Sequence, residues 1–131
     1  MRPSLRPRRW TALSFINAPT PVIFGCSGPT LSPEERTFFQ EAQPLGFILF
    51  KRNIQDKSQV KALIKDLKST VHHGNPPILI DQEGGRVARL AAPHWFHPPA
   101  CATLVDGDIG ASKQRVYDTY LTIAQDLVEL G

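Results

Sequence analysis

The stretch PILIDQEGGRVARL, residues 77–90, decides the fold class. Its apolar run at 78–80 is short and rich in β-branched residues, which is typical of a strand buried on both faces of a parallel sheet. The run stops at Asp81, so the strand delivers this carboxylate to its carboxyl end. Gly84 and Gly85 let the following backbone turn tightly or approach a ligand closely. Because ligands of parallel α/β folds bind outside the carboxyl ends of the strands, Asp81 is well placed for binding or chemistry.

The basic charge of the chain is concentrated in its first nine residues. The 131 residues carry a formal net charge of +3, from 15 Lys and Arg and 12 Asp and Glu. Four arginines precede the first acid, Glu34: Arg2, Arg6, Arg8 and Arg9. Without them 11 basic residues face 12 acidic ones, a net charge of −1. The globular part is therefore near neutral, which argues against a nucleic-acid partner.

Three interpretations compete for residues 1–18. The pair Arg8 and Arg9 ahead of an apolar stretch resembles an export signal, and the acid-free composition also fits a transit peptide. The apolar stretch is short and is interrupted by Ser14 and Asn17, which favours a disordered basic extension or a start codon placed too early. No run reaches the ~18 apolar residues of a membrane span, so the sequence predicts no membrane partner.

The two cysteines do not predict a cross-link or a metal centre. Cys26 and Cys101 lie far apart in the sequence and belong to no CxxC motif. Buried free thiols in a reducing cytoplasm are the expectation for such a pair. The adjacent His72 and His73 point in different directions and make poor joint ligands, so we expect no metal and no cofactor.

Two more buried strands are predicted at 21–26 and 45–50, where short apolar runs recur. Between them a helix is predicted over about 33–42. It begins at Ser32, whose hydroxyl caps the helix while Glu35 completes a capping box. Strand, helix and strand in this order indicate a parallel crossover unit.

Two later helices extend the alternation. Asp56 caps the first, and its single apolar face comprises Val60, Leu63, Ile64, Leu67 and Val71. The second runs over about 111–130, and its apolar face comprises Val116, Tyr120, Ile123, Leu127 and Leu130. The complete order is β-α-β-α-β-loop-α, the start of a parallel α/β fold.

Two polar or aromatic features allow both a functional and a structural interpretation. Lys51, Arg52 and Asn53 follow the second strand, either at the rim of a site or as structural groups of a loop. Trp95, in a Pro-rich loop at about 91–110, either stacks on a sugar ring or folds back to anchor its loop.

The block IDQEGGRV at 80–87, followed by Arg89 and Leu90, resembles the signature of glycoside hydrolase family 3, in its bacterial β-N-acetylhexosaminidase branch. The block FILFKRN at 47–53 is similar to an upstream block of the same branch. Together with smaller similarities, the resemblance covers roughly residues 21–131.

The resemblance implies a TIM (β/α)₈ barrel, of which residues 19–131 would form the N-terminal part with three βα units. A full barrel takes about 250 residues, so the barrel is incomplete here. The implied activity is retaining release of terminal N-acetylglucosamine from glycans or peptidoglycan fragments in the cytoplasm, with no cofactor. Asp81 and Arg89 would bind this carbohydrate substrate.

The catalytic groups of the family have no counterpart in this chain. The aspartate nucleophile and the histidine acid/base would both lie beyond Gly131, so we expect the chain alone to be inactive. Asp81 and Glu83 cannot replace them, because two residues on one loop approach a sugar from the same side. The oligomeric state stays open.

Two other functional classes compete with the glycosidase. The first is a non-catalytic or degenerate sugar-binding fragment. The second is a phosphate binder that uses Gly84 and Gly85, although the acids before these glycines repel phosphate and no Walker spacing is present.

Overall fold

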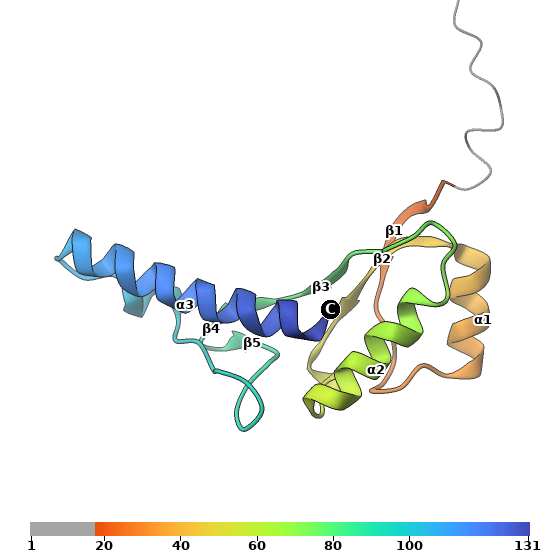
Figure 1. The fold of residues 1–131 in the computed structure, drawn as a ribbon, viewed down its shortest axis with the longest axis horizontal. Helices are drawn as coiled ribbons and strands as arrows, with labels where there is room; N and C mark the ends of the chain where they lie inside the picture. The colour runs from red at the N-terminus through yellow and green to blue at the C-terminus, as the bar shows by residue number, and fades with distance from the viewer. Residues whose placement is uncertain (1–17) are drawn as a thin grey trace, which may run out of the picture.

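A three-stranded parallel sheet forms the centre of the structure, a computed structural model that describes residues 18–131. Residues 1–17 of the predicted basic extension lie outside the described residues. The strands are β1 (Thr20–Phe24), β2 (Pro44–Leu49) and β3 (Ile78–Ile80), hydrogen-bonded in the order β1-β2-β3 (Figure 1). The predicted α/β class with parallel strands is thereby confirmed.

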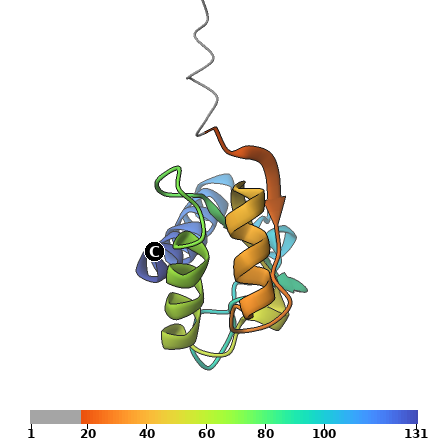
Figure 2. The ribbon, with the colours of Figure 1, turned by 90° about the vertical axis from the view of Figure 1, so that its right-hand side faces the viewer.

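Two helices connect these strands and pack side by side against the sheet (Figure 2). The first, α1 (Pro33–Ala42), begins at Ser32 with the predicted capping box to Glu35. The second, α2 (Lys57–Lys68), begins at Asp56, whose carboxylate accepts a hydrogen bond from the Gln59 backbone N–H at 2.9 Å. Both helix starts agree with the sequence because cap chemistry is local.

The hydrophobic core lies between the sheet and these helices. Each buried aliphatic side chain there contributes about 1.5–3 kcal/mol to the free energy of unfolding. The predicted apolar face of α2 is buried along its whole length, and Phe39 of α1 contacts Phe47 of β2 edge to face. The core residues are Cys26, Phe39, Phe47, Leu49, Val60, Leu63, Ile64, Leu67, Val71, Leu90, Trp95 and Leu130.

The opposite face of the sheet is open, which corrects the prediction of strands buried on both faces. Ile23 of β1 is 41% exposed and Leu79 of β3 is 38% exposed. Nothing within residues 18–131 covers this face, although all-parallel sheets are normally covered on both.

The chain beyond Asp81 forms a small second sheet rather than the predicted plain loop. Strands β4 (Gln82–Gly84) and β5 (Val87–Ala88) pair antiparallel. A loop and a short 3₁₀ turn, η3 (Cys101–Leu104), then lead to the last helix, α3 (Ile109–Leu130). Cys26 is buried as expected, whereas Cys101 is exposed, and both thiols are free.

Helix α3 projects away from the core and touches it mainly at its carboxyl end (Figure 1). There Lys57 of α2 pairs with Glu129 at 2.8 Å, and the Lys68 ammonium donates to the Gly131 carbonyl at 2.6 Å. Of the apolar face predicted for this helix only Ile123 and Leu130 are buried, and Tyr120 is 41% exposed. No helix of the described part is long and apolar enough to cross a membrane.

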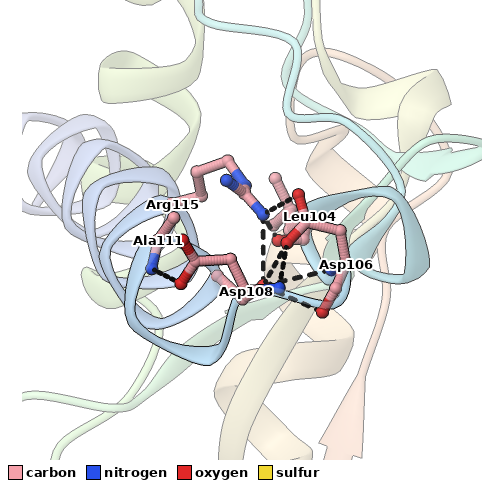
Figure 3. A network of polar contacts seen from close by, with 6 residues as sticks. Leu104, Asp106, Asp108, Ala111 and Arg115 are labelled. Carbon is pink, nitrogen blue, oxygen red and sulfur yellow. Dashed lines mark hydrogen bonds and ion pairs between the residues drawn. The ribbon is translucent and has the colours of Figure 1, made fainter.

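The amino end of α3 is fixed by a polar network, drawn in Figure 3. Asp108 caps the helix by accepting from the Ala111 N–H at 3.0 Å. Arg115 pairs with Asp106 at 2.6 Å and also donates to the Leu104 carbonyl at 3.0 Å, which ties η3 to the helix. The hydrogen bond from Arg115 lowers the pKa of Asp106, with smaller contributions from the Asp108 N–H and the Ser112 hydroxyl.

Candidate functional site

The carboxyl ends of β2 and β3 are followed by polar side chains, and two of those after β2 have structural roles. Asn53, in the 3₁₀ turn η2 (Lys51–Asn53), is completely buried. Its amide donates to the carbonyls of Cys26 and Gly28 at 3.1 and 2.8 Å and accepts from the Phe50 N–H at 2.8 Å. Asn53 therefore joins the loop after β1 to the loop after β2.

Arg52 has the same structural role. Its Nε donates to the Cys26 carbonyl at 3.0 Å, and its guanidinium lies 4.7 Å from the centre of the Phe50 ring. Of the two interpretations of this segment, the contacts favour the structural one for Arg52 and Asn53.

Asp81 and Arg89 lie together at the carboxyl end of β3. The Arg89 guanidinium contacts the Asp81 carboxylate at 3.2 Å, and their side chains are 24% and 45% exposed. Asp81 is thus neither packed among apolar groups nor fully solvated, and part of its carboxylate stays open to a ligand. Charge-assisted hydrogen bonds of such a carboxylate are stronger than neutral ones.

Gln82 holds Arg89 in this position, a contact that the sequence analysis missed. Its side-chain oxygen accepts from the N–H groups of Arg89 and Leu90 at 2.8 and 3.0 Å. Its amide nitrogen donates to the Leu90 carbonyl at 2.8 Å. The Gln82 side chain therefore closes the hairpin and turns Arg89 toward Asp81. The only sequence signal is an amide residue at the start of a Gly-containing turn.

The two glycines of the hairpin approach the chain's own loop at residues 98–100. Gly84 has φ +97°, and a Cβ there would lie 2.1 Å from the Pro99 carbonyl oxygen. The Gly85 N–H donates to the Pro98 carbonyl at 2.8 Å. Because this donor is already used, the geometry gives no support to phosphate binding by the glycine pair.

Glu83, two residues after Asp81, takes no part in the Asp81–Arg89 pair. It is exposed and lines a cavity of about 320 Å³ with Arg86, Cys101 and Tyr120, and Asp81 is absent from that lining. The expectation that Asp81 and Glu83 form no self-contained glycosidase pair stays a prediction.

Trp95 anchors its loop in the core, so of its two interpretations the structural one is confirmed and stacking on a sugar is not. It is 6% exposed and belongs to the hydrophobic core cluster. It also lines a cavity of about 180 Å³ beside Lys51 and Arg89. The ring is too enclosed for a sugar to stack on it. Within residues 18–131 no group of three His, Cys, Asp or Glu side chains could hold a metal ion.

These features define an α/β protein with an acid–arginine pair at the carboxyl end of a parallel sheet, a position where such folds bind ligands. No protein-family model matches the chain. Curated relatives do: it is 34% identical over 115 residues to a β-hexosaminidase of Alkalilimnicola ehrlichii and 31% identical over 109 residues to one of Psychromonas ingrahamii. The matches cover 85% and 82% of this chain and 32% of each relative.

Solved structures agree with these relatives. Native NagZ from Neisseria gonorrhoeae superposes with a TM-score of 0.77 at 28% identity, covering 86% of this chain and 33% of NagZ. Its complex with N-trifluoroacetyl-D-glucosamine gives 0.60 at 31% identity, covering 66% and 25%. A glycoside hydrolase family 3 β-N-acetylglucosaminidase from a Paenibacillus species gives 0.65 at 28% identity, covering 82% and 20%.

The comparisons confirm the resemblance stated from the sequence. The chain is similar to the matched part of these β-hexosaminidases and of a glycoside hydrolase family 3 structure, and it spans about a third of the length of the curated relatives it matches.

Proposed function

We propose that the chain contributes sugar-binding residues to a retaining glycosidase that releases terminal N-acetylglucosamine from glycans or peptidoglycan fragments. In this proposal Asp81 accepts hydrogen bonds from sugar hydroxyls, and Arg89 orients the carboxylate and donates to a sugar oxygen. The observation that carries the proposal is the 3.2 Å pair itself, part-exposed at the carboxyl end of β3. The nucleophile and the acid/base are not assigned to any residue of the chain.

The fold proposal that accompanies this function is an incomplete TIM barrel. Residues 19–131 would supply its first three βα units, with the open apolar face of the sheet as the barrel interior. Support comes from the three neighbouring parallel strands, from helices on one face only, and from apolar side chains such as Leu79 on the other face.

A cytoplasmic location is proposed as well. It is supported by the family resemblance and by the two free thiols, since secreted proteins more often pair their cysteines.

The test needs a complete enzyme. We would replace the matched part of the A. ehrlichii relative by the corresponding part of this chain, and we call the product the chimera. Asp81→Ala in the chimera is expected to raise KM and to lower kcat/KM by at least about 100-fold, because charge-assisted hydrogen bonds contribute about 1.5–3 kcal/mol each. Hydrolysis of a chromogenic N-acetylglucosaminide provides the measurement.

Glu83→Ala is the matched control, because Glu83 is a carboxylate two residues after Asp81 that lies outside the Asp81–Arg89 pair. It should leave kcat/KM within about threefold of the parent. Near-parental kinetics of Asp81→Ala would refute the role of Asp81. Sugar binding by the chimera without turnover would instead favour the non-catalytic alternative. The unmodified 1–131 chain is expected to show no hydrolysis at all.

A further inference from the structure

Two buried N–H donors after the hairpin have no hydrogen-bond acceptor within residues 18–131. They are the Nε of Arg89 and the indole Nε1 of Trp95, a residue that is 6% exposed. The burial of a donor without an acceptor is unfavourable, and such groups are rare in folded proteins. The two donors therefore indicate an acceptor that the described chain does not supply.

The residues that carry these donors line one cavity of about 180 Å³. One wall comes from the segment after β2, with Lys51, Ile54 and Gln55, and the other comes from the segment 89–95. Buried side chains hold both walls in place, Asn53 in the first and Trp95 in the second. The cavity is therefore formed by two segments of the described chain itself.

The lining of this cavity carries positive charge. Lys51 and Arg89 contribute two cations, and no lining residue in the described part of the chain is Asp or Glu. Two acids act on the lining from outside it: Asp81 pairs with the Arg89 Nη2 at 3.2 Å, and Asp56 interacts electrostatically with His94. A guanidinium has five N–H donors, so Arg89 pairs with Asp81 and still offers its Nε to another acceptor. Such a lining favours an acceptor with a negative charge.

The size and the chemistry of the cavity favour a short aliphatic carboxylate over other anions. A carboxylate has two oxygens, one for each buried N–H donor. Phosphate and sulfate carry further charged oxygens, which the apolar part of the lining would leave without donors. That part consists of Ile54, Ala91, Ala92 and Pro93. The volume lies below the ~300–1,000 Å³ of pockets that hold drug-sized ligands, which favours an acid of a few carbon atoms over one carried on a sugar ring.

We propose that this cavity, which we call the Trp95 cavity, is a binding site for a small free carboxylate. One oxygen of the ligand accepts from the Arg89 Nε and the other from the Trp95 Nε1, while the Lys51 ammonium neutralises the charge. The site is separate from the proposed sugar contact of Asp81. Its occupation requires neither a glycan nor turnover, so it goes beyond the proposed function and does not depend on it.

Saturation-transfer NMR with propionate measures this binding directly on the 1–131 chain. The method detects weak ligands on monomeric and associated protein alike, so the result does not depend on the oligomeric state. We expect saturable binding at constant ionic strength. Trp95→Phe removes one donor and keeps an aromatic ring, and it should weaken binding by at least about 10-fold, because a hydrogen bond to a charged group is lost. Lys51→Gln should weaken binding by about threefold, because an exposed ion pair contributes less.

Lys65→Gln is the control, because it removes the same charge at an exposed position of α2 outside the lining of the Trp95 cavity. It should bind propionate like the parent chain. A second readout reports the position of the ligand. With Trp10→Phe, Trp95 becomes the one tryptophan of the chain, and its emission should change as propionate saturates the protein.

Several results would overturn the proposal. They are the absence of saturable propionate binding, equal weakening by Lys51→Gln and Lys65→Gln, and an unchanged Trp95 emission at saturation. Displacement of propionate by phosphate or by glucuronate, as effective as displacement by acetate, would also overturn it, because the site would then select neither a carboxylate nor a small one. Lys51 is exposed, so its variant decides the test even where Trp95→Phe disturbs the core.

Discussion

Arg89 reaches Asp81 because Gln82 determines the path of the backbone between them. The Gln82 side chain makes three hydrogen bonds across the hairpin, at 2.8 to 3.0 Å, and all of them end on Arg89 or Leu90. A carboxylate and a guanidinium eight positions apart would otherwise have to order a free loop at a cost of about 1–2 kcal/mol per residue. The site therefore consists of Asp81 at the end of β3 and Arg89 at the end of the hairpin. The Gln82 side-chain amide keeps the two arms of this hairpin in register.

Gly84 permits the hairpin to lie against residues 98–100, and Gly84→Ala is expected to destabilise it. The substitution places a side chain at φ +97° and 2.1 Å from the Pro99 carbonyl oxygen. We expect a loss of about 2 kcal/mol or more in the free energy of unfolding of the chimera, measured with urea. Gly107→Ala, which has open space and no positive φ, should stay within about 0.5 kcal/mol. Equal stability of the two variants would contradict this account of Gly84.

At the scale of elements, the sequence predicted what local chemistry determines. The starts of α1 and α2 and the buried face of α2 follow from cap residues and from spacing. The position of Asp81 follows from the abrupt end of an apolar run. The role of Gln82 could not be predicted, because its partners Arg89 and Leu90 lie on the other arm of the hairpin. The spacing of residues in the sequence does not determine which residues of the two arms are paired.

Helix α3 was predicted correctly as a helix but not in its burial. Its apolar residues cover more than one side, with Ile123 and Leu130 buried and Leu121 and Val128 exposed. A period of 3.6 residues tells which residues share a face, but it does not tell which neighbours are present to cover that face. The same reason explains Leu79, whose strand was expected to be buried on both sides.

The start of α3 should respond to acid through Asp106. The folded structure lowers the pKa of this carboxyl, chiefly through the hydrogen bond from Arg115. Its stabilising effect is therefore complete above the unfolded pKa, about 3.9, and is lost as the pH falls through the lower folded pKa. Amide exchange of residues 105–115, corrected for intrinsic rates, should stay slow at pH 5 and accelerate below about pH 4.

Asp106→Ala should remove this acid-dependent step and leave exchange fast throughout. Asp118→Ala serves as the control on the same helix, because the Asp118 carboxylate accepts from the Gln114 side chain and not from the start of the helix. The acceleration of amide exchange in acid should also be smaller in high salt, because salt screens the exposed Asp106–Arg115 pair. If exchange in Asp106→Ala still accelerates below about pH 4 as in the parent chain, another group is responsible for the acid response.

At the scale of the whole molecule, the described part has more apolar surface than its own core covers. The open face of the sheet, the outer edges of β1 and β3 and the side of α3 that carries Tyr117, Leu121 and Val128 are all uncovered within residues 18–131. Unpaired strand edges beside apolar surface favour association with other chains. The position of the open surfaces matches the proposal that the sheet is one part of a closed barrel.

We therefore expect the purified 1–131 chain to associate. Sedimentation should give an average mass above the 14.6 kDa of the monomer, and the mass should rise with protein concentration. Val128→Glu should lower the average mass, because it places a charge on the most exposed apolar side chain of α3, whereas Gln114→Glu should not. A monomer that melts cooperatively would show that the open sheet is stable in water by itself. The uncovered apolar surface would then no longer support the barrel proposal.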